Sequence, residues 1–484
     1  MLKSTRQQVH QRIAQVLTER FPATMEIQPE LVAHHYTEAG LIEHAMPYWE
    51  RAGQRSIARS AYVEAINHLS TGLEYLKVLP ETPQRIAHEL TLLMALGRAL
   101  IATKGYAASE VGATYTRARA LCQRGVQSPQ LFPVLFGLWQ FYVLQGELQL
   151  ARELGERLLA LAQHLQESAY VLEAHRSLAF TFFSLGEMVA ARAQAEQGIT
   201  LYHPDKHHAH VFTYGQDPGT SCLAYAALAL WHLGYPEQAL QRCHEMLKLA
   251  HALSHPFSLA HALYFASLLH QHRREVPEAR ECAEAAIALA TEHGFALYVV
   301  RGTLQRSWAL TEQGQLAEGI DQMRQSLTAY RGTGAGLVLP YFLARLAEAC
   351  GKGERIEAGL HVLDEALTLV DKHGECWWEA ELHRLQGVLR LQQAVPDARQ
   401  AEGCLQQALA IASRQQAKSL ELRAAMSLSR LWQRQGKRDD ARQVLAEVYG
   451  WFTEGFDTAD LQEASALLQA LGGGAGRRSS PPVS

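Results

Sequence analysis

The stretch FYVLQGELQLARELGERLLALA, residues 141–162, contains the kind of turn that decides the fold of this chain. An apolar segment ends at Gly146 and a second one begins at once, with Ala151 five residues after the glycine. Glycine adopts the left-handed conformation that ends a helix without steric cost, so a new helix can start directly after it. The small side chain of Ala151 lets two antiparallel helices approach closely. The stretch therefore predicts a helix hairpin.

The same combination of residues recurs along the chain. At seven positions a glycine is followed five residues later by alanine or glycine: Gly40 and Ala45, Gly146 and Ala151, Gly186 and Ala191, Gly234 and Ala239, Gly314 and Gly319, Gly353 and Ala358, Gly436 and Ala441. Between these turns apolar residues recur with the period of a helix, as at Val171, Ala174, Leu178 and Phe182. No segment alternates with the period of a strand. The sequence therefore predicts an all-α fold built from helix hairpins.

The hairpins follow one another at a nearly constant interval. Gly146 and Gly186 are 40 residues apart, Gly314 and Gly353 are 39 apart, and the 80 residues from Gly234 to Gly314 contain one degenerate turn. A period of about 40 residues resembles tetratricopeptide (TPR) repeats with lengthened helices. This resemblance implies a right-handed α-solenoid with a concave surface for partners.

The two ends of the chain differ from the repeats. Residues 1–28 predict an N-terminal helix and linker, and the TPR-like α-solenoid is expected to cover 29–471. Residues 472–484 are rich in Gly, Ser and Pro, which cannot form a packed core, so a disordered tail is expected there.

Composition narrows the class of protein. The 484 residues carry 45 Lys and Arg against 49 Asp and Glu, a balance that argues against a nucleic-acid partner. Seven dispersed cysteines without a C-x-x-C pair indicate reduced thiols. The N-terminus lacks the apolar core of a signal peptide, and the uninterrupted apolar run at 222–231 is too short to span a bilayer. A cytoplasmic protein with no membrane partner is expected.

Several longer passages resemble one class of bacterial protein. They are LVAHHYTEAGLIEHAMPYWERAGQRSIARSAYVEAINHLSTGLEYL at 31–76, and the passages at 102–123, 214–240 and 374–392. Together they resemble the helical region that follows the ATPase module in bacterial signalling ATPases of the STAND class. That class includes fusions with class III adenylate/guanylate cyclase domains and relatives of the maltose-type transcription activator. The resemblance implies a sensor or scaffold region in a signalling protein.

The chain departs from that class in its catalytic motifs. It has no P-loop of the form G-x-x-x-x-G-K-[ST], no cyclase-like strand with metal-binding aspartates, and no nucleophile-elbow phrase. We therefore expect no enzymatic activity, no cofactor and no metal in this chain. It matches only the sensor half of the class, either as a free-standing protein or as a part whose catalytic module is encoded upstream.

One passage does not fit the repeat. The interval from Gly186 to Gly234 is 48 residues long, and the surplus predicts an inter-repeat loop at 203–217. Long loops on rigid scaffolds often bind partners, so we select as candidate contact residues His208, His210, Tyr214 and Asp217. A solvated loop packed over the groove is an alternative. A metal site with histidine and aspartate ligands is another, although the loop lacks the rigid spacing of zinc ligands.

A second candidate site lies at Cys376-Trp377-Trp378-Glu379. Adjacent helical residues point about 100° apart, so one ring could face a groove while the other packs in the core. We select Trp378 and Glu379 as candidate contact residues, with the alternative that both rings pack between helices. Glu379 and His383 are four residues apart on one helix face, which predicts a surface ion pair or hydrogen bond.

These observations predict a non-enzymatic TPR-like solenoid that binds a protein, a peptide or a small effector on its concave face. It would pass that occupancy to an ATPase or cyclase module in cis or in trans. The alternative hypothesis is that the chain is the regulatory C-terminal region of a cyclase–ATPase or of a STAND transcription regulator.

Overall fold

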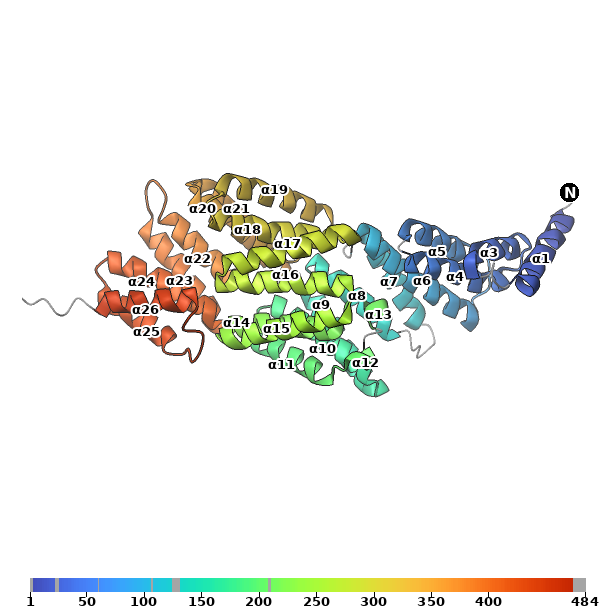
Figure 1. Cartoon of the computed structure of the whole chain (residues 1–484), viewed down its shortest axis with the longest axis horizontal. Helices are drawn as coiled ribbons and strands as arrows, with labels where there is room; N and C mark the ends of the chain where they lie inside the picture. The colour runs from blue at the N-terminus through green and yellow to red at the C-terminus, as the bar shows by residue number, and fades with distance from the viewer. Residues whose placement is uncertain are drawn as a thin grey trace, which may run out of the picture. The chain divides into compact units, whose positions relative to one another are not determined.

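The computed structural model describes residues 3–21, 26–59, 61–105, 108–123, 131–207 and 210–472. The elements are α-helices joined mostly by short turns, and none of the described residues forms a strand (Figure 1). The helices pack chiefly against their neighbours in the chain, as expected for a solenoid. This confirms the predicted all-α solenoid of helix hairpins.

The chain divides into two compact units. The first comprises Met1–Gln145 with Thr333–Ala335, and the second comprises Gly146–Gly332 and Gly336–Ser484. The division at Gly146 falls within the single solenoid expected for 29–471. The tail expected at 472–484 lies outside the described residues, except for Gly472 at the end of the last helix.

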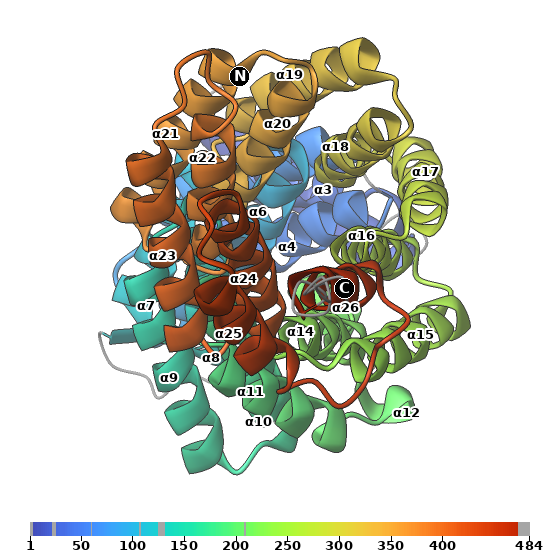
Figure 2. The ribbon, with the colours of Figure 1, turned by 90° about the vertical axis from the view of Figure 1, so that its left-hand side faces the viewer.

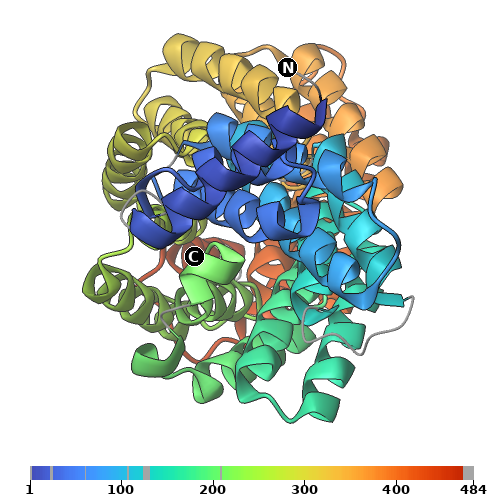
Figure 3. The ribbon, with the colours of Figure 1, turned by 90° about the vertical axis from the view of Figure 1, so that its right-hand side faces the viewer.

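The first unit consists of hairpins whose successive helices pack side by side (Figure 3, blue to cyan). Its helices are α1 (Lys3–Arg20), α3 (Pro29–Glu38), α4 (Ile42–Ala58), α5 (Tyr62–Leu76), α6 (Pro83–Lys104), α7 (Ser109–Gln123) and α8 (Leu131–Gln145). Trp49, Leu69, Leu92 and Phe136 are among the side chains buried between them.

Helix α6 is long and apolar enough, by length and composition alone, to cross a membrane. Half of its most apolar window is buried inside the protein, where α6 packs against α4, α5 and α7. Its Glu89 is buried and accepts a hydrogen bond of 2.8 Å from Nε of Arg117 on α7. The helix thus packs as a core helix of the first unit.

The second unit continues the series of hairpins along a curved path (Figure 2). Its helices are α9 (Leu148–Leu165), α10 (Ser168–Ser184), α11 (Met188–Leu201), α12 (Pro204–His207), α13 (His210–Tyr214), α14 (Pro218–His232), α15 (Pro236–Leu253), α16 (Pro256–Arg273), α17 (Val276–His293), α18 (Ala296–Glu312), α19 (Leu316–Gly332), α20 (Leu339–Lys352), α21 (Ile356–His373), α22 (Glu379–Arg390), α23 (Ala398–Arg414), α24 (Lys418–Arg434), α25 (Arg438–Tyr449) and α26 (Ala459–Gly472).

The turn glycines adopt the predicted left-handed conformation at most sites. Positive φ angles are found at Gly40, Gly146, Gly186, Gly234, Gly314 and Gly436. At Gly186 the next amide, that of Glu187, donates a hydrogen bond of 2.9 Å to the carbonyl of Phe182, which closes a Schellman cap. The alanines five residues after the turn are fully buried at Ala45, Ala151, Ala191, Ala239 and Ala441.

One predicted turn is wrong by one residue. Gly353 has a φ of −90°, and the left-handed residue is Glu354, with a φ of 58°. The small residue at the helix contact is likewise Gly359, not the half-buried Ala358. A Cβ atom on Gly359 would lie 2.8 Å from Cδ1 of Leu389 and 3.1 Å from the carbonyl oxygen of Ala347, so this close approach favours glycine. The five-residue spacing from turn to contact therefore places the turn at Glu354.

The degenerate turn expected between Gly234 and Gly314 lies at Arg274. Arg274 has a φ of 65°, and Ala279, five residues later, is fully buried. The amide of Glu275 donates a hydrogen bond of 2.9 Å to the carbonyl of His270, as in the glycine turns. The geometry of the hairpin is therefore kept even where the glycine is replaced.

The path of the second unit closes on itself. The amide of Cys376, just before α22, donates to the carbonyl of Ser184 at the end of α10, 3.0 Å away. The hydroxyl of Ser419 on α24 donates to the carbonyl of Trp231 on α14 at 2.5 Å. Figure 1 shows α24 and α26 at one end of the preceding hairpins, and in Figure 2 they overlap the middle of the path because that view looks along the long axis. The C-terminal ends of α14 and α16 are therefore contacted by α24, one of the chain's own C-terminal helices.

Aromatic side chains fill the inside of this closed path. Their ring centroids lie about 5–6 Å apart, and the cluster consists of Trp231, His232, His272, Tyr341, Trp377 and Trp378. Burial of such large rings is a major source of stabilisation. The cluster joins hairpins that are far apart in the sequence into one core.

Candidate functional site

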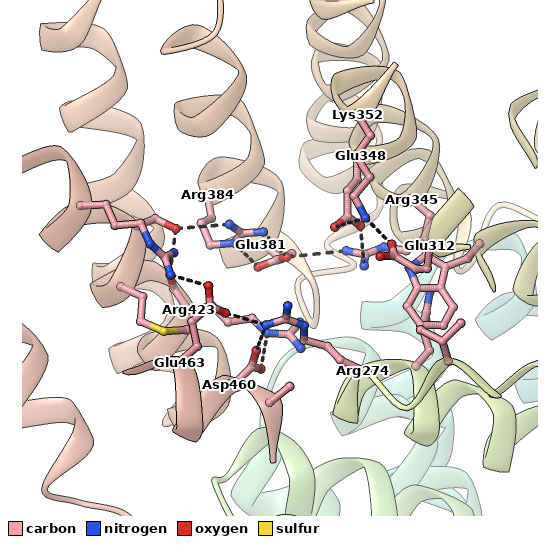
Figure 4. Close-up of a pocket in the computed structure, with 17 residues that line it drawn as sticks. Arg274, Glu312, Arg345, Glu348, Lys352, Glu381, Arg384, Arg423, Asp460 and Glu463 are labelled. Carbon is pink, nitrogen blue, oxygen red and sulfur yellow. Dashed lines mark hydrogen bonds and ion pairs between the residues drawn. The ribbon is translucent and has the colours of Figure 1, made fainter. Parts of the chain in front are cut away.

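A cavity of about 390 Å³ lies beside this aromatic cluster, within the second unit. Its walls are formed mainly by α16, α18, α20, α22, α24 and α26, which turn their inner faces toward one another (Figure 4). The volume falls in the range of about 300–1,000 Å³ that is usual for ligand sites. We call this cavity the charged pocket.

The lining of the charged pocket is mostly ionic. Six cationic side chains contribute to it: Arg274, Arg345, Lys352, Arg384, Arg423 and Arg430. Five anionic side chains contribute as well: Glu312, Glu348, Glu381, Asp460 and Glu463. The lining therefore carries one more positive than negative charge. Charges gathered on an inner face are costly unless they are paired or used, which makes this cavity the candidate site.

Glu381 lies at the floor of the pocket and is 2% exposed. Arg384 donates to both of its oxygens, at 2.7 and 2.8 Å, and Nη2 of Arg345 lies 3.7 Å away (Figure 4). Burial by itself would raise the pKa of Glu381, but Arg384, Arg423 and Arg345 together lower it to about 2. The floor therefore holds an ionised carboxylate already engaged by Arg384.

Arg345 is the most buried cation of the pocket that is not saturated by partners. Its guanidinium lies 5.1 Å from the ring centre of Trp378 and 5.7 Å from that of Tyr341, while Nη1 is 3.0 Å from Oε2 of Glu348. Burial would raise the pKa of Glu348, but Arg345 and Lys352 lower it. Among the described residues, no acceptor makes a hydrogen bond with Nε or Nη2 of Arg345.

Arg423 connects the helices that form the lower wall. Its Nε lies 2.7 Å from Oδ2 of Asp460 on α26, and its Nη2 donates to the carbonyl of His272 on α16 at 2.6 Å. The guanidinium also lies 5.0 Å from the ring centre of Trp231. One arginine thus positions α24, α26 and α16 relative to one another.

The rim of the pocket is more exposed and is formed by ion pairs. Nη1 of Arg274 lies 3.1 Å from Asp460 and 2.7 Å from Glu463, and Arg430 lies 2.5 Å from Glu463. Exposed pairs of this kind contribute only about 0–1 kcal/mol each. A charged ligand can therefore exchange partners with the rim at little energetic cost.

The candidate residues of the 203–217 passage lie elsewhere. The predicted loop contains two short helices, α12 and α13, and His208 lies outside the described residues. Nδ1 of His210 is 2.7 Å from Oε1 of Glu173, which is fully buried on α10 and also pairs with Arg176 at 2.7 Å. His210 is thus part of a buried polar cluster.

Tyr214 and Asp217 are buried, 6% and 0% exposed, so the alternative of a solvated loop is wrong for this part of the passage. Asp217 accepts hydrogen bonds of 2.8 Å from the amide of Thr220 and from the hydroxyl of Tyr202. It therefore caps the N-terminus of α14. Burial raises the pKa of both Asp217 and Tyr214. None of these described residues lines the charged pocket.

The tryptophan pair lies in the core. Trp377 and Trp378 are 3% and 2% exposed, in agreement with the interpretation that both rings pack between helices. Trp378 is not among the described residues that line the pocket, but Arg345, which lines it, lies over the Trp378 ring. Glu379 is half-buried, burial raises its pKa, and no hydrogen bond or ion pair joins it to His383 in the described structure. The predicted Glu379–His383 pair is therefore not formed.

The pocket residues were not selected from the sequence, although the sequence contains a signal for them. Glu348 lies six residues before the turn residue Glu354, and Arg430 lies six residues before Gly436. The two occupy equivalent inner positions on the first helices of their hairpins. Charged residues at this position in two hairpins are the pattern that would have indicated the pocket.

The alternative of a metal site concerns the histidines and aspartates of 203–217. Among the described residues, no group of three or more His, Cys, Asp or Glu side chains is arranged to hold a metal ion.

Comparisons with known proteins concern the fold. No family model matches the chain. An uncharacterised protein of Rhizobium meliloti (strain 1021) is 27% identical over 438 residues, which is 89% of this chain and 42% of that protein. The chain thus spans about two fifths of the length of this curated relative.

Two solved structures resemble the chain at low sequence identity. The Rap protein complexed with Competence and Sporulation Factor has a TM-score of 0.51 at 13% identity, over 82% of this chain and 99% of that one. The APC/C hetero-tetramer Cut9–Hcn1 has a TM-score of 0.52 at 12% identity, over 96% of this chain and 94% of that one. Both likenesses support a TPR-like helical repeat fold for this chain.

Proposed function

We propose that this chain is a non-enzymatic scaffold that binds a peptide or a protein segment in the charged pocket of its second unit. The observation that carries the proposal is the convergence of ionic side chains from α16, α18, α20, α22, α24 and α26 on one cavity. The likeness to a Rap protein solved in complex with Competence and Sporulation Factor supports the idea that such a solenoid can hold a partner.

The chemistry of the lining favours a peptide over other ligands. Cations and anions alternate around the pocket, so a ligand carrying both charges finds partners for each. A nucleic acid or a nucleotide would bring several negative charges close to Glu381, Asp460 and Glu463. An apolar effector would leave most of these ionic groups without water or a partner, at a high cost in free energy. A small effector that itself carries both charges is the second candidate.

The proposal extends to a signalling context. Passages of the chain resemble the helical region of STAND-class ATPases, and the Rhizobium relative is more than twice as long as the part that matches. We propose that occupancy of the pocket is passed to an ATPase or cyclase module, in cis or in trans, in the cytoplasm. In the alternative form of this proposal the chain is the regulatory region of such an enzyme.

The test compares two pairs of substitutions in the full chain against an array of peptides. Arg274→Gln with Arg430→Gln removes two cations from the rim, and we expect the affinity for bound peptides to fall at least tenfold. The control, Arg280→Gln with Arg331→Gln, removes two arginines that are similarly exposed and ion-paired but lie outside the pocket. Equal loss in both variants would contradict the proposal, and hydrolysis of ATP by the purified chain would contradict its non-enzymatic part.

A further inference from the structure

We infer that Arg345 and Gln271 form a carboxylate-binding subsite at the floor of the charged pocket. The inference rests on the proposed function and specifies the group of the ligand that is recognised. It is carried by buried hydrogen-bond donors that have no acceptor among the described residues and that belong to two side chains of the same cavity lining.

The guanidinium of Arg345 is the first part of the subsite. Arg345 is 8% exposed, and the rings of Trp378 and Tyr341 hold it at 5.1 and 5.7 Å. Nη1 forms an ion pair of 3.0 Å with Oε2 of Glu348 and Nη2 lies 3.7 Å from Oε1 of Glu381, whereas neither Nε nor Nη2 makes a hydrogen bond with any described residue. These two donors belong to the same edge of the guanidinium. That edge is the one that binds a carboxylate through two parallel hydrogen bonds.

The amide of Gln271 is the second part. Gln271 is 3% exposed, and its Oε1 accepts a hydrogen bond from the hydroxyl of Tyr341. That hydroxyl in turn accepts from Nε2 of Gln305 at 3.4 Å, so its single proton is directed toward Gln271. The amide is thereby oriented with Nε2 as a donor, and no described residue accepts from this Nε2.

The nearby carboxylates do not supply the missing acceptor. Glu381 is 3.7 Å from Nη2 of Arg345, beyond hydrogen-bond distance, and both of its oxygens are held by Arg384. Glu348 is engaged with Nη1 of Arg345 and with Lys352, 3.8 Å away. Burying donors without acceptors is costly, so a ligand that supplies one is bound favourably.

The charge of the lining selects the kind of anion. The pocket has six cationic and five anionic side chains, a surplus of one positive charge. A single carboxylate neutralises this surplus, whereas a doubly charged phosphate would exceed it. Two parts of a peptide supply a carboxylate, namely the C-terminus and the side chain of Asp or Glu.

The first experiment measures binding of acetylated tetrapeptide libraries to the full chain by titration calorimetry. One library has free C-termini and no acidic residues, the second is its amidated counterpart, and the third is amidated with one Glu at a fixed position. We expect the second library to bind at least tenfold more weakly than a carboxylate-bearing one. Tight binding of the first library identifies the C-terminus as the source, and tight binding of the third identifies a side chain.

The second experiment uses Arg345→Lys, which keeps the charge but removes the paired donors of the guanidinium. We expect it to lose at least tenfold in affinity for the carboxylate-bearing library and to bind the amidated library as the wild type does. Arg280→Lys, outside the pocket, is the matched control and should change neither affinity. If Arg345→Lys does not fold by circular dichroism, Gln271→Leu should still lower the affinity for carboxylates about threefold.

The outcomes separate the inference from the proposed function. Equal binding of the free-acid, amidated and Glu-containing libraries to the wild type overturns the carboxylate subsite and leaves a peptide-binding scaffold. Unchanged selectivity in both Arg345→Lys and Gln271→Leu also overturns the subsite alone. Failure of every library to bind at millimolar concentration overturns both.

Discussion

At the scale of single residues, the hairpins depend on one left-handed position and one close contact five residues later. The sequence shows this pair clearly where glycine and alanine occupy the two positions. It misplaces the pair at Gly353, because another glycine, Gly359, lies one residue beyond the expected Ala358. Gly359 packs against Leu389, which belongs to the following hairpin, and the left-handed residue lies five positions before Gly359. Glu354 therefore adopts a conformation that its own type does not favour.

The left-handed position at Glu354, not at Gly353, leads to a prediction about two glycine substitutions. Gly436 has a φ of 80° and no neighbour that would obstruct a Cβ atom, so Gly436→Ala measures backbone strain alone. We expect it to lower the free energy of unfolding by about 1 kcal/mol. Gly353→Ala should change it little, because φ is −90° there and the nearest atom would lie at 3.5 Å. Thermal and urea denaturation provide the measurement. A larger loss for Gly353→Ala than for Gly436→Ala would contradict the register.

At the scale of elements, the passage 203–217 contains short helices where the sequence predicts a loop. The sequence predicts a loop there because the interval from Gly186 to Gly234 is longer than the other repeats. In the structure, short helices form because polar side chains find partners on neighbouring elements, as His210 does with Glu173 and Asp217 does with Tyr202. A polar residue without local partners in the sequence can thus be buried when a distant helix supplies one.

Asp217 provides the test of this element. Replacing Asp217 by Ala removes the cap of α14 and leaves the half-buried hydroxyl of Tyr202 without its acceptor. Loss of a cap costs about 0.5–2 kcal/mol, and an unsatisfied buried group would add about 1–3 kcal/mol, with the lower part of that range expected for a half-buried hydroxyl. We therefore expect a loss of about 2–4 kcal/mol in the free energy of unfolding. Asp205→Ala, at an exposed position of α12, should cost almost nothing. Similar melting of the two variants would show that the passage is a spacer.

At the scale of the second unit, the chain closes through contacts between residues more than 200 positions apart. The loop 450–458, between α25 and α26, lies against the turn between α14 and α15. Glu454 accepts hydrogen bonds from the amides of Glu237 and Gln238 at 2.9 and 3.1 Å, so it caps α15. The ring of Trp451 leaves no room for a side chain at Gly234, where an added Cβ atom would lie 2.6 Å from it. This closure brings α26 to the rim of the charged pocket.

Glu454→Ala should loosen the closure without unfolding the hairpins. A solenoid is stabilised mainly by contacts between neighbouring repeats, so the effect of losing one distant cap should remain local. We expect faster amide hydrogen exchange in 450–472 and in the first turn of α15, with little change in α16 to α19. The control Glu447→Ala removes an exposed acidic residue of α25. Faster exchange throughout the unit would show instead that the closure is required for the fold as a whole.

The sequence by itself determined the all-α class, the hairpins, their period and most of their turns, because helix periodicity and turn chemistry act over a few residues. Only the tertiary structure decided the division at Gly146, the burial of Tyr214 and Trp378, and the charged pocket. The pocket depends on small rotations between successive hairpins that accumulate until α24 and α26 lie beside α16. A local sequence pattern does not specify the accumulated rotation, because it depends on how side chains pack between distant helices.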